Sequence, residues 1–194
     1  MNETREFAKW LAGLRFSDLP ENVVDFTKRF ILDDIGCMLG GSLQLGNKAL
    51  MRDILAQGEK AQSTIAVYGH KTSAPSAALV NGAFICGWDY DSTAKGGGHM
   101  GSQTAAMLAM AERELADGKE MITAECAGIE TQCRIGSADG HGTEFPYPWH
   151  SNTILGPFAA AVATGKILGF DADLMENALA IATCSVGGNY QHYY

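Results

Sequence analysis

The stretch that decides the fold is PENVVDFTKRFILDDIGCMLGG, residues 20–41. Its apolar side chains recur at spacings of three and four, which is the period of an α-helix with one buried face. Pro20 suits the first turn of a helix, and Gly40-Gly41 supplies a stop signal. We therefore predict a helix over residues 20–40 whose buried face consists of Val23, Val24, Phe26, Phe30, Ile31, Ile35, Met38 and Leu39.

The same period recurs along most of the chain. It predicts further helices over residues 4–14, 47–57, 74–88, 102–117, 119–138, 155–168 and 171–184. The segment STIAVY, residues 63–68, is the best strand candidate, and we expect it to form a small hairpin or an edge strand. Alanine and glycine are abundant in the predicted helices, and small residues let helices approach closely. The sequence therefore predicts a mainly α fold, a helical bundle with at most a small β element near residues 63–68.

Composition narrows the class of protein. The 194 residues carry 14 basic and 22 acidic side chains, a net charge of −8, which argues against a nucleic-acid partner. No apolar run is long enough for a membrane span, so we expect no membrane partner. The five cysteines are odd in number, widely spaced and without a C-x-x-C pair. This usage predicts reduced core thiols, Cys86 and Cys133 among them, in a cytoplasmic protein.

Two stretches interrupt the helical pattern, and functional side chains gather in them. Residues 89–99 contain Asp89, Asp91, Thr93 and His99, a set that can donate, accept and orient protons. The glycines at 96–98 allow close approach of a ligand or a sharp turn. Ser102 then follows as the expected N-cap of the next helix, whose N-terminus could receive a carboxylate.

The second interruption, residues 140–150, ends in Trp149 and His150. His150 either caps the next helix or faces the same pocket as His99. The other histidines, His70, His141 and His192, are interpreted as surface or loop residues, and Lys166 is expected to point to solvent.

A metal site is a rival use for Asp89, Asp91 and His99. Their donor types suit a metal ion, but no familiar ligand spacing accompanies them, so we predict that no metal is bound.

Several separated segments, in the right order, resemble the MmgE/PrpD superfamily of 2-methylcitrate dehydratase-like and cis-aconitate decarboxylase-like proteins. They are residues 31–42 (ILDDIGCMLGGS), 83–99, 133–136 (CRIG) and 149–158. The resemblance implies an all-helical domain, a smaller α+β lid and an active site between the two. It implies action on small di- and tricarboxylates without a metal or organic cofactor. Dehydration, decarboxylation and epimerisation are the family's activities, and all involve proton transfer at a carbon next to a carboxylate.

The resemblance also implies the site residues. It places catalytic residues at Asp89, Thr93, His99 and His150. The histidines would act as acid, base or carboxylate-binding groups, Asp89 would orient a histidine or relay a proton, and Thr93 would bind substrate. We add as substrate-binding candidates Asp91, Lys95, Ser102 and Trp149; Arg134 is a second nearby cation. The sequence departs from the family at Ser92, where an acid is frequent, and at Met100 and Ser151, where proline is frequent.

The family's chains are about twice as long or longer. We therefore expect residues 1–194 to form the N-terminal part of the helical domain, without the lid and the remaining helices. A second polypeptide that carries the complementing C-terminal portion would complete a cofactor-independent lyase, or the chain is a truncated product. We also expect a homo-oligomer. The alternatives are a dicarboxylate epimerase (an isomerase) of the same family and a non-catalytic helical association module.

Overall fold

The computed structural model describes residues 2–138 and 149–188. Eight α-helices make up most of the described chain, which confirms the mainly α prediction. They are α1 (Glu3–Gly13), α2 (Glu21–Gly41), α3 (Leu45–Ala56), α4 (Ala74–Ile85), α5 (Ser102–Glu114), α6 (Gly118–Ser137), α7 (Ser151–Ile167) and α8 (Ala172–Ala182). Among these described helices, none is both long and apolar enough to cross a membrane.

Short elements connect the helices. Three 3₁₀ turns cover η1 (Phe16–Asp18), η2 (Cys86–Trp88) and η3 (Thr183–Ser185). Two antiparallel hairpins pair β1 (Ser63–Thr64) with β2 (Lys71–Thr72), and β3 (Thr93–Ala94) with β4 (Gly98–His99). The first hairpin confirms the small β element, but the predicted strand at 65–68 is wrong. Val67 lies in the left-handed region (φ 71°), so the chain turns there instead of extending.

Local sequence sets where the helices begin. The Asp117 carboxylate accepts the Lys119 and Glu120 N–H groups, and Glu120 in return accepts the Asp117 N–H. Asp171 and Ser73 are one-sided N-caps, which accept the Leu174 N–H at the start of α8 and the Ser76 N–H at the start of α4. These side chains satisfy donors that the first turn of a helix leaves unpaired.

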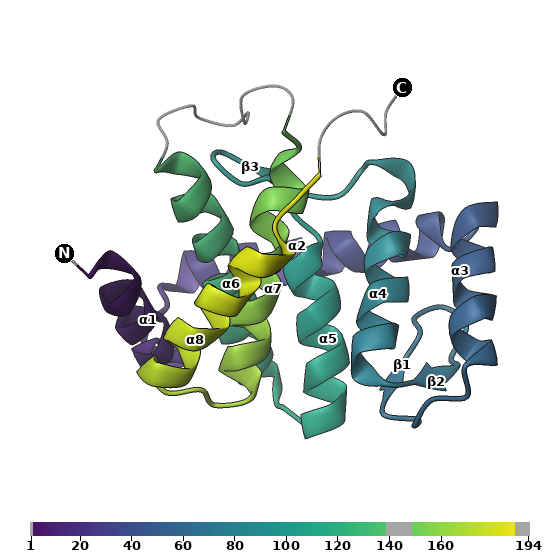
Figure 1. The fold of residues 1–194 in the computed structure, drawn as a ribbon, viewed down its shortest axis with the longest axis horizontal. Coiled ribbons are helices and arrows are strands. Elements are labelled where there is room, and N and C mark those ends of the chain that lie inside the picture. Colours follow the sequence, from purple (N-terminus) through teal and green to yellow (C-terminus); the bar gives the residue numbers. More distant parts are fainter. Residues whose placement is uncertain (1, 139–148, 189–194) are drawn as a thin grey trace.

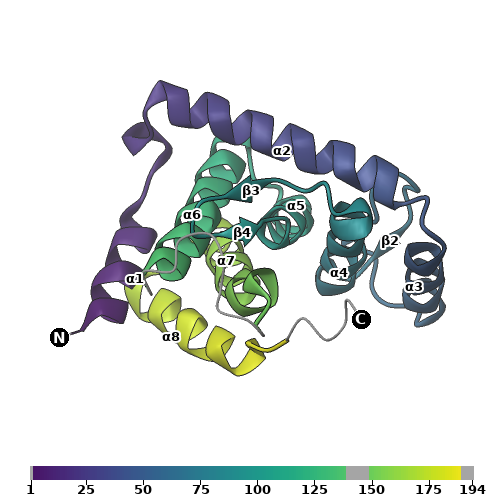
Figure 2. The same cartoon turned by 90° about the horizontal axis from the view of Figure 1, so that it is seen from above.

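The helices form one packed body around α5, α6 and α7, which contact one another closely (Figure 1). Helices α1 and α8 lie together on one side, and α4 and α3 follow on the other. The long helix α2 runs along an outer edge of this group (Figure 2). Small residues allow the close contacts: a Cβ on Gly128 of α6 would lie 2.7 Å from the Gln103 side chain of α5.

The predicted burial of α2 is wrong for part of its apolar row. Phe30 and Met38 are buried, but Phe26, Ile35 and Leu39 are 53%, 39% and 56% exposed. Because α2 lies at the edge, only a narrow stripe of it meets the rest of the described structure. That stripe also buries a carboxyl group, Asp34.

Lys166 contradicts its prediction as a solvent-pointing residue. Its half-buried ammonium donates to the Ala12 and Leu14 carbonyl oxygens, at 3.1 and 2.7 Å. These carbonyls lie at the C-terminal end of α1, where helices leave acceptors unpaired and favour a cation. Burial lowers the pKa of Lys166.

The cysteines are free, as predicted, but they are not all core residues. Cys126 is buried, whereas Cys86 and Cys184 are exposed. The expectation of core thiols is therefore wrong for these two, because both belong to 3₁₀ turns that follow helix ends.

Candidate active site

The first interruption of the helical pattern forms the hairpin β3–β4, with Thr93 opposite His99. Gly96 at its tip has φ 82°, and the Gly97 N–H donates to the Ala94 carbonyl at 3.0 Å. The tip lies directly against the C-terminal end of α6. A Cβ on Gly136 would come within 1.8 Å of the Gly96 carbonyl oxygen. Glycine is therefore required at this crossing for steric reasons.

Side chains from two helices hold the hairpin. On α6, the Gln132 amide donates to the Gly97 and His99 carbonyl oxygens at 2.8 and 2.7 Å. On the α2 side, the Ser92 hydroxyl donates to Asp33 at 2.9 Å. No sequence motif marks Gln132 or Asp33 as a site residue. Two consecutive acids inside an apolar helix are the signal that could have pointed to α2.

His99 forms the centre of the cluster. Its Nδ1 lies 3.1 Å from Asp91 Oδ1 and 3.7 Å from Asp89 Oδ1. The Asp91 side chain is 1% exposed, the Asp89 side chain 64% and the His99 side chain 32%. The structure thus brings together three predicted site residues, with Asp91 and not Asp89 as the close partner of the imidazole.

The environments of the two aspartates differ for a local reason. Asp89 ends the 3₁₀ turn η2 in the left-handed conformation (φ 56°), which turns the chain so that Asp91 points inward. Burial raises the pKa of the Asp91 carboxyl, and the nearby His99 opposes that rise.

The N-terminal end of α7 forms the other side of the site. A Cβ on Gly98 would lie 2.2 Å from Ser151 Oγ, so the strand that carries His99 touches the start of α7. His150 is the N-cap residue of α7 and is buried, and its carbonyl oxygen accepts the Thr153 hydroxyl at 2.9 Å. Trp149 beside it is 48% exposed.

Ser102 is not the N-cap predicted from the sequence. Gly101 occupies that position, and Ser102 begins α5. Its hydroxyl instead donates to Asn152 of α7 at 3.3 Å. Ser102 and Asn152 line an open cavity of about 480 Å³ together with Thr153, Gly156, Pro157, Ala160, Ser185 and Gly187.

The remaining predicted residues lie at the periphery or elsewhere. Thr93 and Lys95 are exposed on the hairpin. Arg134 lies over the Trp10 ring at 4.8 Å and pairs with Glu130 at 2.7 Å, away from His99. Residues 140–148 of the second interruption, including His141, and His192 lie outside the described residues.

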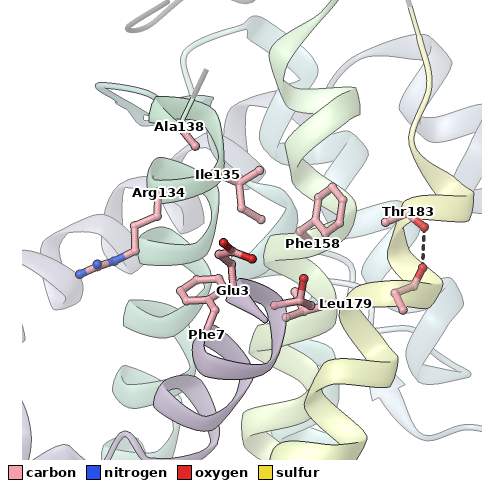
Figure 3. A pocket seen from close by; sticks show the side chains of 10 residues that line it. Glu3, Phe7, Arg134, Ile135, Ala138, Phe158, Leu179 and Thr183 are labelled. Carbon is pink, nitrogen blue, oxygen red and sulfur yellow. Dashed lines mark hydrogen bonds between the residues drawn. The ribbon is translucent and has the colours of Figure 1, made fainter. Parts of the chain in front are cut away.

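A second cavity, of about 550 Å³, lies between α1, α6, α7 and α8. Figure 3 shows Phe7, Ile135, Phe158 and Leu179 around it, while the Arg134 guanidinium points away. This mainly apolar lining does not suit a polycarboxylate, which needs cations or hydrogen-bond donors.

The metal alternative has a geometric basis. Single ligand atoms of Asp89, Asp91 and His99 lie within 4.8 Å of one another. Two carboxylates and an imidazole could together bind one metal ion of hard or intermediate character. The same geometry serves a hydrogen-bonded acid–base pair, so the ligand set alone does not decide between the two uses.

Comparison with known proteins gives consistent results over nearly the whole chain. The sequence pattern of the family described as MmgE/PrpD N-terminal domain matches residues 5–193. A cis-aconitate decarboxylase-like protein, oryM, of Aspergillus oryzae is 31% identical over 96% of this chain and 41% of its own length. The cis-aconitate decarboxylase of Aspergillus terreus is 31% identical (95% and 39% covered), and that of Homo sapiens 29% (95% and 40%). The chain thus spans about two fifths of the length of these relatives.

Proposed function

The chain belongs to the MmgE/PrpD family, and from this premise we propose that it forms the His99-bearing part of a lyase for small di- or tricarboxylates. The proposed reaction is dehydration or decarboxylation by proton transfer next to a carboxylate, without a cofactor. The observation that supports it best is the His99–Asp91 pair at 3.1 Å, on a hairpin that touches the start of α7.

The pair has the geometry of an oriented acid–base group. If Nδ1–H donates to the Asp91 carboxylate, Nε2 of the neutral imidazole is free to accept a proton. For dehydration, a base removes a proton from the carbon next to a carboxylate, an acid protonates the departing hydroxyl group, and water leaves as the double bond forms. For decarboxylation, the bond to one carboxylate breaks, carbon dioxide leaves, and an acid delivers a proton to carbon. Buried Asp91 fixes the ring, and partly exposed His99 reaches substrate.

The start of α7 supplies a place for a substrate carboxylate. Helix N-termini attract anions through unpaired N–H groups and the helix dipole. We propose that His150 and Trp149 border this end and that Ser102 contributes its hydroxyl next to Asn152. Lys95 on the hairpin would offset part of the substrate charge, and Thr93 would add a hydrogen bond.

We propose that the functional unit contains more than these residues. Among the described residues of the site, Lys95 is the one cation beside Asp89, Asp91 and His99, and one cation is too little to balance a tricarboxylate. Because the matched relatives are about two and a half times as long, a complementing portion or a second copy would supply further donors. The free cysteines support the proposal of a cytoplasmic location.

The test is turnover of cis-aconitate and of 2-methylcitrate, followed by NMR, on the protein alone and with any polypeptide that co-purifies. His99→Ala should lower kcat/KM by about 10²-fold or more, because an acid–base group is removed. His70→Ala is the matched control, since His70 lies exposed on the β1–β2 hairpin and uses its backbone carbonyl to accept from Ile65. Equal activity of the two variants would contradict the role of His99.

A specific observation also favours the association module. Leu32, Ile35 and Leu39 expose 68%, 39% and 56% of their surface on one side of α2. An apolar row of this kind favours helix-to-helix association. Analytical ultracentrifugation of Leu39→Glu separates the candidates: loss of self-association with unchanged substrate binding would assign this face to association alone. The epimerase alternative differs in substrate, and an imino-dicarboxylate in the same NMR assay tests it.

A further inference from the structure

A cluster of polar side chains lies inside the bundle behind the hairpin. Asp34 of α2, Thr104 of α5 and Glu125 of α6 are each 0% exposed. They are 70 and 21 residues apart in sequence, so only the packing of three helices brings them together. Burying carboxyl groups is costly unless they are neutralised or paired.

The hydrogen bonds of this cluster determine how many protons its two carboxyl groups carry. Thr104 Oγ1 is in hydrogen-bond contact with Asp34 Oδ2 and lies 2.8 Å from Glu125 Oε1. A hydroxyl carries one proton and can donate to one acceptor at a time. The other carboxyl must therefore donate to the hydroxyl oxygen, which requires that it be protonated. The geometry thus calls for at least one proton shared across the two acids.

The charges around the pair favour that proton. Asp33 and Asp91 face Asp34, and the Cys37 and Cys86 thiols are also near its charge. Glu125 faces Asp34 itself and the Gln103 amide, which donates at 3.2 Å. These described groups are acidic or neutral, so no cation among them offsets a second negative charge. Burial raises the pKa of Asp34 to about 7 and that of Glu125 to about 8, and the hydrogen bonds from Thr104 oppose the rise.

The cluster connects to the candidate active site through Ser92. The Ser92 hydroxyl donates to Asp33 at 2.9 Å, and Asp33 directly precedes Asp34 in α2. The Ser92 carbonyl accepts the Met100 N–H at 2.9 Å. Ser92 lies between Asp91 and Thr93, and Met100 directly follows His99. Displacing Ser92 would therefore displace both members of the His99–Asp91 pair.

We propose that Asp34 and Glu125 are positioning residues that share one proton through Thr104 and thereby hold Ser92, Asp91 and His99 in place. The inference rests on the proposed function, because this positioning serves a reaction only if His99 acts on substrate. The tests below use no turnover, so the positioning role and the proposed reaction can fail independently.

The shared proton is tested by infrared spectroscopy of the protein at neutral pH. A protonated carboxyl gives a carbonyl band that an ionised one lacks. We expect that band in the unmodified protein and its loss in the double variant Asp34→Asn/Glu125→Gln. Glu59→Gln is the matched control, because Glu59 is exposed, accepts from the Thr72 and Ser73 hydroxyls and has a lowered pKa. Absence of the band in the unmodified protein, or its survival in the double variant, overturns the shared proton.

The positioning role is tested by NMR of the Ser92 amide and the His99 ring. Asparagine at 34 reproduces a protonated acid, so Asp34→Asn should leave both signals in place. Asp34→Ala removes the buried contact with Thr104 that holds this part of α2, so it should shift the signals of the Ser92 amide and of the His99 ring nitrogens. If the alanine variant does not fold, Thr104→Val keeps the side-chain volume, removes the bridge and should give the same shifts. Unchanged Ser92 and His99 signals in the variant that folds refute the positioning role.

Discussion

Replacing glycine by alanine should have opposite effects on stability at two helical positions: Gly136, where α6 touches the β3–β4 hairpin, and Gly36, in the open interior of α2. At Gly136 an added Cβ would lie 1.8 Å from the Gly96 carbonyl oxygen and 2.7 Å from Leu155. Because non-bonded carbon and oxygen atoms need roughly 3.3 Å, the hairpin must move by about 1.5 Å. That movement breaks the two hydrogen bonds from Gln132, which are 2.8 and 2.7 Å long.

The magnitude follows from three contributions. Two lost hydrogen bonds cost about 2 kcal/mol in unfolding free energy, and overpacking adds about 1–3 kcal/mol. Alanine in a helix interior stabilises the folded protein by about 1 kcal/mol relative to glycine, which offsets part of this loss. Gly136→Ala should therefore destabilise by about 2–4 kcal/mol, which lowers Tm by about 5–15 °C in a protein of this size.

Gly36→Ala is the matched control. Gly36 lies in the interior of α2 with no atom within 4 Å of an added Cβ, so only the gain in helix propensity remains. Thermal unfolding by circular dichroism should show a Tm raised by about 2–4 °C. In NMR spectra, the His99 signals should shift in Gly136→Ala and stay in place in Gly36→Ala. If both variants are stabilised alike, the described contact between α6 and the hairpin is wrong.

Three further variants test individual contacts. In Glu125→Gln the neutral amide replaces an acid whose pKa burial raises from 4.5 to about 8. Because the pKa of Glu125 is raised in the folded protein, its contribution to the free energy of unfolding is complete below about pH 4.5 and is lost as pH rises to 8. The glutamine variant should therefore be more stable than the unmodified protein by about 2–5 kcal/mol at pH 8. Its free energy of unfolding should also depend less on pH. Lys166→Met removes two donors to α1 carbonyls and should cost about 1–3 kcal/mol in denaturant unfolding. Asn81→Leu leaves the Ala66 N–H and Thr64 carbonyl without their partner and should cost about 2–4 kcal/mol, with faster amide exchange at Ala66; unchanged exchange there would contradict the contact.

The candidate site could be located from the sequence but not assembled from it. The glycine run at 96–98 marks the segment, because glycine disfavours a helix interior, and Asp89, Asp91 and His99 lie beside it. Which acid meets His99 depends on the left-handed turn at Asp89, which no spacing rule supplies. Gln132 and Asp33 could not be chosen among the many similar polar residues of the helices, because their role depends on which helix face meets the hairpin.

Repetition at three and four residues determined the helices of this protein, because helix period and capping are local properties of a few consecutive residues. The sequence also determined the acidic charge and the order of motifs that matches a known family. Only the tertiary structure decided that α2 lies at an edge with Phe26, Ile35 and Leu39 of its predicted apolar row exposed. It also decided that Asp34 and Glu125 meet across Thr104. Burial and pairing of this kind arise from contacts between helices distant in sequence, and no local pattern encodes them.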